Sequence, residues 1–299
     1  MFNQFIALLL PFTPKFIVKF FSGRYIAGEK VEDAIQICKG LQDQGFLTTL
    51  DILGESVTTL EQAATAKNEY LALLDTIIAS GIEKNVSLKP TALGLAIDEN
   101  IGIQNITEIV MRAHELGIFI RIDMENSPFT DITLKLYLDL KKTYSNIGTV
   151  IQAYMKRSFK DVQNIIENDG NLRICKGIYK ESPAIAFQKR EEVQDYFMKL
   201  IEEMLRHKTY VGIATHDDVL FERSIKLIED ADIFKENFEF QALLGVPVLN
   251  QLHALKDKGF KVRIYVPYGK EWFAYSTRRL KENPNIAGQV LGNIFKRSH

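Results

Sequence analysis

Two adjacent arginines near the end of the chain have the chemistry to bind an anion together. Arg278 and Arg279 follow Tyr275 in the stretch YSTRRL, and guanidinium groups make bidentate, charge-assisted contacts with carboxylates and phosphates. Residues three and four apart share a helix face, so the tyrosine and both arginines can reach one pocket. Adjacent helical residues also point about 100° apart, so a solvated helix face stays an open interpretation until the pair is placed in a fold.

Residue spacing gives little support for other kinds of site. Cys38 and Cys175 stand far apart without a CxxC motif, which argues against a disulfide framework or a zinc site and favours reduced thiols in a cytosolic protein. No GxSxG elbow indicates a serine hydrolase, and CKGIYK, with Gly177 alone, is a weak phosphate-binding signal. We expect no metal, because the histidines lack ligand spacing: His114, His207, His216, His253 and His299.

The overall charge does not indicate a nucleic-acid partner. The 299 residues are 46% hydrophobic and 25% charged, with a formal net charge of -1, which is typical of a soluble globular protein. The N-terminal stretch MFNQFIALLLPFTPKF contains an apolar run broken by Pro11 and Pro14. It is too short to span a bilayer and lacks the basic start of a secretory signal. We expect a packed N-terminal helix, with a membrane-skimming helix as the alternative.

Short β-rich runs alternate with segments of helical spacing along the chain. Eight such pairs follow one another at about 30 residues, as βα repeats require, and eight units close into a TIM-type barrel. An open doubly wound sheet would show a GxGxxG turn where this chain has LGES. We predict a (βα)8 barrel catalytic domain over residues 46–299, preceded by an N-terminal helical extension over residues 1–45. The predicted strands are 46–53, 85–90, 118–125, 149–154, 172–179, 210–216, 238–245 and 261–269, and the predicted helices are 58–80, 103–116, 131–144, 158–167, 191–206, 219–228, 247–258 and 272–281.

Polar residues end nearly every predicted strand, which is where the catalytic groups of a barrel lie. In the third run, Arg121 and Asp123 share one face, while isoleucines at 118, 120 and 122 form an apolar face for the helix ring. Cations outnumber the nearby acids Glu55 and Asp123, so we expect a basic pocket for an anionic ligand. The polar residues are Glu55, Lys89, Arg121, Asp123, Glu125, Gln152, Tyr154, Arg173, Lys176, Tyr179, Thr215, His216, Asp217, Glu239, Gln241, Arg263, Tyr265 and Tyr268.

The order of these motifs resembles the proline dehydrogenase family, which are flavin enzymes with a distorted TIM barrel. The match runs from RYIAGE at residues 24–29 to YSTRRLKENPN at residues 275–285, and each motif falls where the barrel prediction places it. Between them come LDILGE, VSLKPTALG, RIDME, IQAY, LRICKGIYKE, ATHD, EFQALLG and RIYVPYG. The brief N-terminal extension and the YGKEW spacing resemble the compact monofunctional bacterial form, so we expect no aldehyde dehydrogenase half.

The resemblance implies FAD and the oxidation of L-proline to 1-pyrroline-5-carboxylate, the first step of proline catabolism, with electrons passed to a membrane quinone. It implies that Arg278, Arg279 and Lys89 bind the proline carboxylate. Tyr265 and Tyr275 would line the proline ring. In the family, a tyrosine at the position of Tyr265 goes with proline and a smaller residue with hydroxyproline, so we expect proline as the substrate.

The resemblance also implies catalytic and cofactor-binding roles. Asp123 would orient Lys89 and the arginine pair, and Arg173 would be a donor near the flavin N5. The chain has Cys-Lys-Gly-Ile-Tyr where the family often has Val-Lys-Gly-Ala-Tyr, so the Ile178 side chain must point away from a flavin that contacts its backbone. The expected flavin-binding residues are Met124, Gln152, Arg173, Cys175, Lys176, Gly177, Ile178, Thr215 and His216.

Two other functions stay open on the residues alone. One is a Schiff-base lyase on the same barrel with Lys89 or Lys176 as the nucleophile. The other is a non-catalytic barrel that serves as a binding module. We expect a cytoplasmic protein, and a peripheral contact with the inner face of the cell membrane stays open, as does the physiological electron acceptor.

Overall fold

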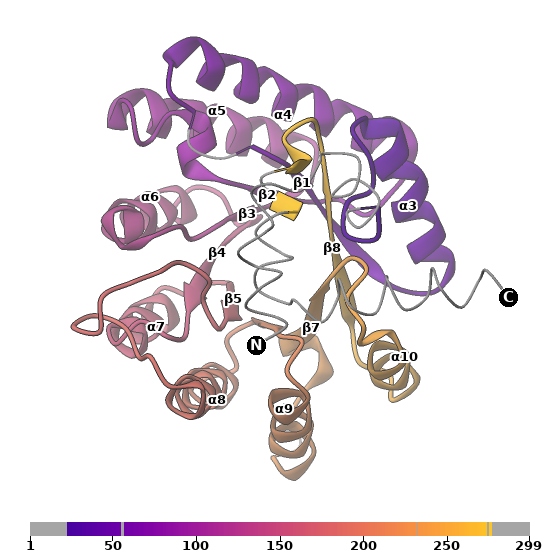
Figure 1. The fold of residues 1–299 in the computed structure, drawn as a ribbon, viewed down its shortest axis with the longest axis vertical. Helices are drawn as coiled ribbons and strands as arrows, with labels where there is room; N and C mark the ends of the chain where they lie inside the picture. Colours follow the sequence, from indigo (N-terminus) through magenta and orange to yellow (C-terminus); the bar gives the residue numbers. More distant parts are fainter. Residues whose placement is uncertain (1–22, 55–56, 232, 274, 277–299) are drawn as a thin grey trace, which may run out of the picture.

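Eight parallel strands form a closed barrel with helices around it (Figure 1). The computed structural model describes residues 23–54, 57–231, 233–273 and 275–276. Strands pair in chain order, and β1 closes the ring against β8, from Leu47 beside Arg263 to Ile52 beside Tyr268. The predicted (βα)8 barrel is therefore confirmed. The strands are β1 (Leu47–Ile52), β2 (Asn85–Leu88), β3 (Phe119–Ile122), β4 (Ile147–Gln152), β5 (Leu172–Cys175), β6 (Val211–Ala214), β7 (Phe238–Leu243) and β8 (Val262–Tyr268).

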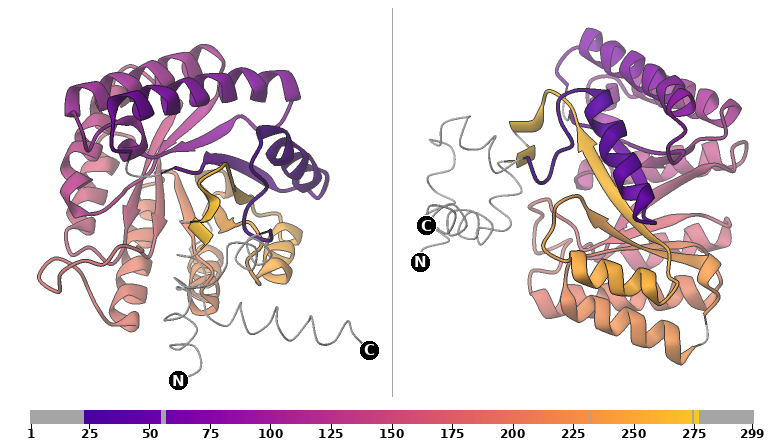
Figure 2. Two further views of the ribbon diagram at one scale, coloured as in Figure 1. Left: turned by 45° about the horizontal axis from the view of Figure 1, so that its top comes forward. Right: turned by 90° about the vertical axis from the view of Figure 1, so that its right-hand side faces the viewer.

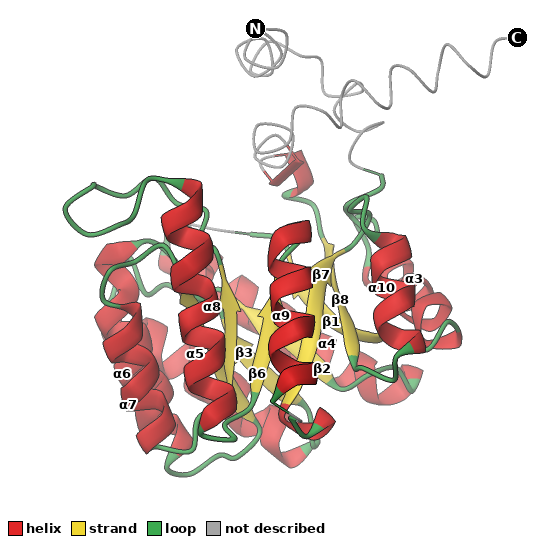
Figure 3. Ribbon diagram, turned by 90° about the horizontal axis from the view of Figure 1, so that it is seen from below, coloured by secondary structure: helices red, strands yellow, loops and turns green. Residues whose placement is uncertain are grey.

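Helices pack around the outside of the strands (Figure 3). In α4 (Leu60–Ser80), Thr59 and Gln62 form a capping box at the start, and Gly81 ends the helix with a φ of 68°. The 3₁₀ turns η2 (Pro90–Leu93), η3 (Ser127–Phe129) and η4 (Lys235–Asn237) lie in the connections. The other described helices are α3 (Val31–Asp43), α5 (Glu99–Glu115), α6 (Thr130–Lys141), α7 (Ser158–Glu167), α8 (Arg190–Arg206), α9 (Asp218–Asp230) and α10 (Leu249–Asp257).

Element boundaries differ from the predicted ones at identifiable residues. The helix predicted from residue 103 begins at Glu99, because the Asp98 side chain accepts a hydrogen bond from the Ile101 backbone N–H at 3.1 Å and caps it. The strand predicted over residues 172–179 ends at Cys175. Gly177 follows with a φ of 107°, which is incompatible with a continuing strand. The loops that carry candidate chemistry therefore begin earlier than predicted.

Helix α3 belongs to the outer ring although it precedes the first strand. It packs against β1 and β8, beside which it lies in Figure 2. Part of the predicted N-terminal extension thus flanks the barrel, and residues 1–22 lie outside the described part. Of the helix predicted over residues 272–281, residues 272, 273, 275 and 276 are described and are helical.

The two faces of β3 divide as predicted. Ile120 and Ile122 are fully buried on the helix side, whereas Arg121 points into the barrel and is 3% exposed. Its Nη1 donates to the backbone oxygens of Thr149, at 3.0 Å, and of Asn171, at 2.9 Å. These acceptors offset the cost of burying the guanidinium group. The barrel interior is thus filled by a hydrogen-bonded polar layer, above which the mouth residues sit.

Candidate active site

Lys89 lies directly after β2 at the barrel mouth, with 9% of its side chain exposed. Its Nζ is 2.6 Å from Asp51 Oδ1 on β1 and 3.3 Å from the Tyr265 hydroxyl on β8. Asp123, which follows β3, is farther away, with its Oδ2 3.8 Å from Nζ. Asp123, the residue expected to orient Lys89, is therefore the more distant of the two carboxylates. The nearer one, Asp51, was missed by the sequence analysis.

Asp51 is a fully buried carboxyl group. Its Oδ2 makes no hydrogen bond to any of the described residues. Burial raises the pKa of Asp51 to about 6, and the charge of Asp123 adds to this, while Lys89 and the Tyr265 hydroxyl oppose it. A carboxyl group whose pKa lies so close to neutrality can change its protonation state near physiological pH.

Asp123 is held by donors from three directions. Arg173 Nη1 donates to Oδ1 at 2.9 Å, the Tyr265 hydroxyl donates to Oδ2 at 3.0 Å, and the Ser87 hydroxyl donates to Oδ1 at 3.3 Å. Burial, together with the charges of Asp123 and Asp51, raises the pKa of Tyr265 well above its usual value. Tyr265 thus keeps its proton and remains a donor to Asp123.

Arg173 on β5 joins the mouth residues to the opposite side of the barrel. Its Nε donates to Gln241 Oε1 at 2.5 Å, and its Nη2 donates to the Ser87 hydroxyl at 3.2 Å. Its guanidinium carbon is 5.1 Å from the centre of the Tyr265 ring, within cation–π range. With its bond to Asp123, Arg173 connects residues of β2, β3, β5, β7 and β8, so its position is strongly constrained.

The described part of the mouth does not carry the predicted excess of cations. Lys89 and Arg173 pair with Asp51 at 2.6 Å and with Asp123 at 2.9 Å. The excess was predicted without Asp51, because the first strand was expected to end later and to present Glu55. Glu55, Arg278 and Arg279 lie outside the described residues.

The residues expected to bind the flavin lie on the other half of the mouth, at the ends of β4, β5 and β6. Gln152 donates from Nε2 to the Glu125 backbone oxygen at 2.8 Å. The Thr215 hydroxyl accepts from the Asp217 backbone N–H at 3.1 Å. His216 Nε2 accepts from the Leu243 backbone N–H at 2.9 Å, so a neutral imidazole carries its proton on Nδ1. These contacts fix the orientations of the three side chains.

Asp217 ties the loop after β5 to α8, a contact set that the sequence analysis did not foresee. Its side chain, 1% exposed, accepts from Lys176 Nζ at 3.0 Å, Arg190 Nη2 at 3.1 Å and Gln194 Nε2 at 3.0 Å. Although burial opposes ionisation, these hydrogen bonds and the Lys176 charge lower the pKa of Asp217 to about 2. Lys176 is thereby held beside the loop of residues 175–179.

The loop after β5 has a backbone that requires glycine. At Gly177 φ is 107°, and a Cβ there would collide with the Tyr154 ring. Ile178 is 44% exposed, so its side chain points to solvent. This agrees with the expectation that the isoleucine, which replaces the family's usual alanine, points away from a flavin. Met124 is buried, and Cys175 is partly buried against the core.

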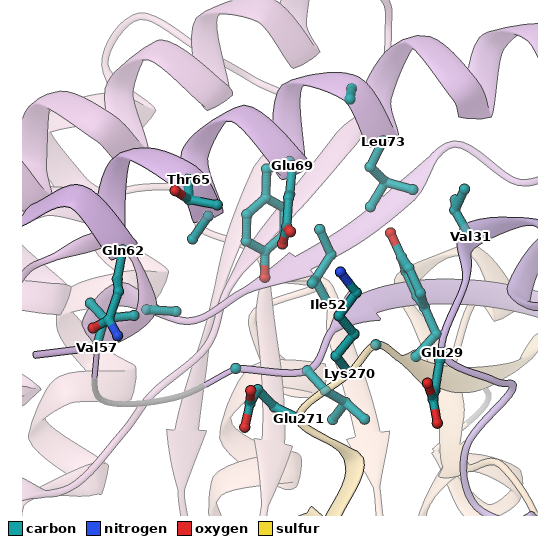
Figure 4. Close-up of a pocket in the computed structure, with 18 of the residues that line it drawn as sticks. Glu29, Val31, Ile52, Val57, Gln62, Thr65, Glu69, Leu73, Lys270 and Glu271 are labelled. Carbon is teal, nitrogen blue, oxygen red and sulfur yellow. The ribbon is translucent and has the colours of Figure 1, made fainter. Parts of the chain in front are cut away.

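Tyr275 is one of the residues that line a cavity of about 910 Å³. The cavity separates α4 from the ends of β1 and β8, and Figure 4 shows Thr65 and Glu69 of α4 facing Ile52 and Lys270. Tyr275 packs with Tyr25, Ile26 and Leu53, and its interaction with Tyr265 contributes to the raised pKa of that residue. The two tyrosines expected to line the proline ring are therefore near one another.

The described part of the chain has neither a membrane-spanning helix nor a metal-binding cluster. None of its helices combines the length and apolarity needed to cross a bilayer. Its histidine, cysteine and acidic side chains form no group able to hold a metal ion.

Comparison with known proteins identifies the family. The sequence model described as proline dehydrogenase matches residues 34–291. Proline dehydrogenase 2 of Bacillus subtilis (strain 168) is 37% identical over 276 residues, covering 92% of this chain and 91% of that protein. The proline dehydrogenase of Deinococcus radiodurans is 33% identical over 280 residues, covering 91% and 89%. The crystal structure of proline utilization A from Bdellovibrio bacteriovorus, with a TM-score of 0.82 and 24% identity, covers 89% of this chain but 33% of its own and supports the fold alone. The chain belongs to the proline dehydrogenase family.

Proposed function

We propose that this dehydrogenase uses FAD to oxidise L-proline to 1-pyrroline-5-carboxylate and passes the electrons to a quinone. The observation that carries the proposal is the division of the barrel mouth into two halves. Lys89, Asp123 and Tyr265 come from β2, β3 and β8, while the donors expected for the flavin come from β4, β5 and β6. Arg173 joins the halves through its bond to Asp123, which supports a substrate group next to a cofactor group.

The donors on β4 to β6 fit the acceptor-rich edge and phosphates of a flavin dinucleotide. Gln152, Thr215 and His216 are buried or partly buried polar groups in fixed orientations, and Lys176 supplies a positive charge near the same loop. Arg173 is the proposed donor beside the reacting flavin nitrogen. When bound, the flavin supplies the acceptor for the substrate's hydride, and the protein supplies orientation and electrostatics.

The substrate half is built to hold a small zwitterion. Tyr265 offers its ring face, and Lys89 supplies a cation beside it, 6.0 Å from the ring centre. We propose that Arg278 and Arg279 complete the carboxylate site, because Lys89 and Arg173 are already paired with Asp51 and Asp123. Fixing the carboxylate would align the ring C–H with the flavin, which is a positioning effect.

The visible spectrum of the purified protein, recorded anaerobically before and after L-proline is added, tests this proposal. A flavin spectrum that proline bleaches, and that a water-soluble quinone restores, is the expected result. A colourless protein that cannot be reconstituted with FAD would contradict the cofactor assignment. A yellow protein that proline does not bleach would contradict the substrate. Trapping of a carbonyl substrate on Lys89 by borohydride would instead revive the lyase hypothesis, which family membership disfavours along with the binding-module hypothesis.

Substitution of the arginine pair tests the carboxylate site separately. Arg278→Met or Arg279→Met should weaken proline binding by about 2–5 kcal/mol, as expected for one partner of a buried charge pair, while flavin content is kept. Arg223→Met is the matched control, because Arg223 pairs with Asp195 at 2.8 Å on the surface, with 41% of its side chain exposed. Normal proline kinetics in both arginine variants would show that the carboxylate is bound elsewhere.

A further inference from the structure

The two carboxylates beside Lys89 differ in how completely they are paired. Asp123 accepts hydrogen bonds from Arg173, Tyr265 and Ser87. Asp51 accepts from Lys89 through Oδ1, while its Oδ2 makes no hydrogen bond within the described part of the chain. A carboxylate with several donors is stabilised as an anion, whereas a buried carboxylate with a vacant oxygen can accept a proton at lower cost. Such a contrast between neighbouring acids often separates their roles in catalysis.

Among the described residues, the groups that face Asp51 favour one route for protons. Lys89 and Asp123 follow β2 and β3, Tyr265 and Tyr268 lie on β8, and Tyr70 lies on α4. Burial raises the pKa of all three tyrosines, so they keep their protons at neutral pH. Asp51 is fully buried, whereas Lys89 retains slight exposure at the mouth. Of the described groups, Lys89 is therefore the one best placed to carry protons to Asp51.

Oxidation of a cyclic amino acid releases a proton that such a route can take. The substrate nitrogen is a secondary ammonium with a pKa in the range of lysine, about 10.4, and so arrives protonated at neutral pH. It must lose one proton before its lone pair can form the carbon–nitrogen double bond as hydride leaves the neighbouring carbon. A buried site can accept that proton without involving bulk water.

We propose that Asp51 stores the proton removed from the substrate nitrogen and receives it through Lys89 Nζ. One N–H bond of the Lys89 ammonium breaks as an O–H bond forms on Asp51, and the Lys89 lone pair then takes a proton from the substrate ammonium. Lys89 ends as an ammonium, Asp51 as a carboxylic acid and the substrate as a neutral amine. No electrons move in this step, and Asp51 returns the proton through Lys89 after the product leaves. Asp51 is a positioning residue in this scheme, which rests on the proposed function.

The electrostatic surroundings suit such a store. With a pKa raised by burial to about 6, Asp51 is ionised and ready to accept at pH 7, yet holds a proton far better than an ordinary aspartate. Asp123 contributes because its negative charge favours the protonated form of Asp51. The 2.6 Å distance between Lys89 Nζ and Asp51 Oδ1 is within the range for direct proton transfer.

The test measures flavin bleaching by proline in single turnovers of wild type and Asp51→Asn from pH 5 to pH 10. At pH 7 the variant should be about 100-fold slower in kcat/KM, as for the loss of a general base. The deficit should shrink below about tenfold by pH 10, because more of the substrate then arrives as the neutral amine. A wild-type-to-variant ratio that stays constant over this range would indicate a purely structural role and overturn the proposal. Bleaching of the wild type by proline is established first, so failure of the proposed function would be recognised separately.

Two controls separate the proton store from general disruption. Tetrahydrofuran-2-carboxylate, which has an ether oxygen in place of the amine and brings no proton, should bind Asp51→Asn at least as tightly as wild type, because the variant lacks one negative charge. Asp123→Asn should move the acid limb of the wild-type profile to lower pH, because removing that charge makes Asp51 a stronger acid. An unmoved limb would count against the proposal.

A measurement on the wild type keeps the proposal testable should Asp51→Asn not fold. The infrared difference spectrum during anaerobic single turnover should show the stretching band of a protonated carboxyl group. Isotopic labelling of the aspartate carboxyl carbons should shift that band. Absence of the band would overturn the proposal without any variant.

Discussion

Arg173→Lys is the substitution that most directly tests how the two halves of the mouth are joined. Arg173 is 7% exposed and contacts Gln241, Asp123 and Ser87 from three different nitrogens. Lysine keeps the positive charge but replaces a planar fork with a single ammonium group. Its amine can remain near Asp123, but it cannot at the same time reach Gln241 and Ser87.

The magnitude follows from the two contacts that are lost. Each buried polar group left without its partner costs about 1–3 kcal/mol. Loss of the bonds at 2.5 Å to Gln241 and at 3.2 Å to Ser87 should therefore lower the free energy of unfolding by about 2–6 kcal/mol. In a domain of this size that corresponds to a drop in Tm of about 5 °C or more. If about 2 kcal/mol of this lost interaction energy normally stabilises the transition state, kcat/KM for proline falls about 30-fold.

Thermal unfolding and steady-state kinetics with proline measure the two effects, and Arg157→Lys is the matched control. Arg157 makes an equally short pair with Asp161, at 2.7 Å, but its side chain is 38% exposed on the outside of the barrel. The control should lose less than about 1 kcal/mol and keep normal kinetics. If Arg173→Lys behaved like the control in both assays, the inference that Arg173 connects the two halves would be wrong.

Three further substitutions test neighbouring features. Tyr265→Ser should reduce the preference for proline over hydroxyproline, measured as the ratio of kcat/KM values, since it removes the ring proposed to line the substrate site. Ionised Asp217 stabilises the fold above the ordinary carboxyl pKa of about 3.9, and this contribution is lost as pH falls through about 2. The Tm values of wild type and Asp217→Asn should therefore differ at pH 6 and converge over that acid range. Gly177→Ala should lower both Tm and flavin content, because alanine is strained at a φ of 107° and its Cβ collides with Tyr154.

The barrel could be predicted because its signal is periodic and recurs along the chain. In β3 the alternation of isoleucine with Arg121 set both the strand and its two faces, and burial in the structure follows that division. Boundaries were less predictable because single residues decide them. Asp98 extends α5 toward its N-terminus by capping it, and the backbone at Gly177 ends the extended segment early.

Candidate site residues could be found from their positions at strand ends, but their partners could not. Lys89, Asp123, Arg173 and Tyr265 lie together, which parallel strands with a common end require. Asp51 was missed because LDIL was taken as the body of a strand. The available signal was its alternation with Thr49, which faces the same side of β1, and its register beside Ser87 of β2. Which carboxylate lies nearer Lys89 depends on side-chain positions across strands, and those have no periodic signature.

The charge balance of the mouth links the proton store to substrate recognition. With Lys89 and Arg173 paired to Asp51 and Asp123, these four groups carry no net charge when all are ionised. They therefore match a zwitterion, whose own charges also cancel. Once the substrate nitrogen has lost its proton, the substrate is an anion, and a buried anion without a counter-charge costs several kcal/mol. Transfer of that same proton to Asp51 leaves the four groups with one net positive charge, so the charges of the mouth and the substrate balance until the hydride leaves. Release of the proton to water would instead leave the carboxylate to be compensated by Arg278 and Arg279 alone.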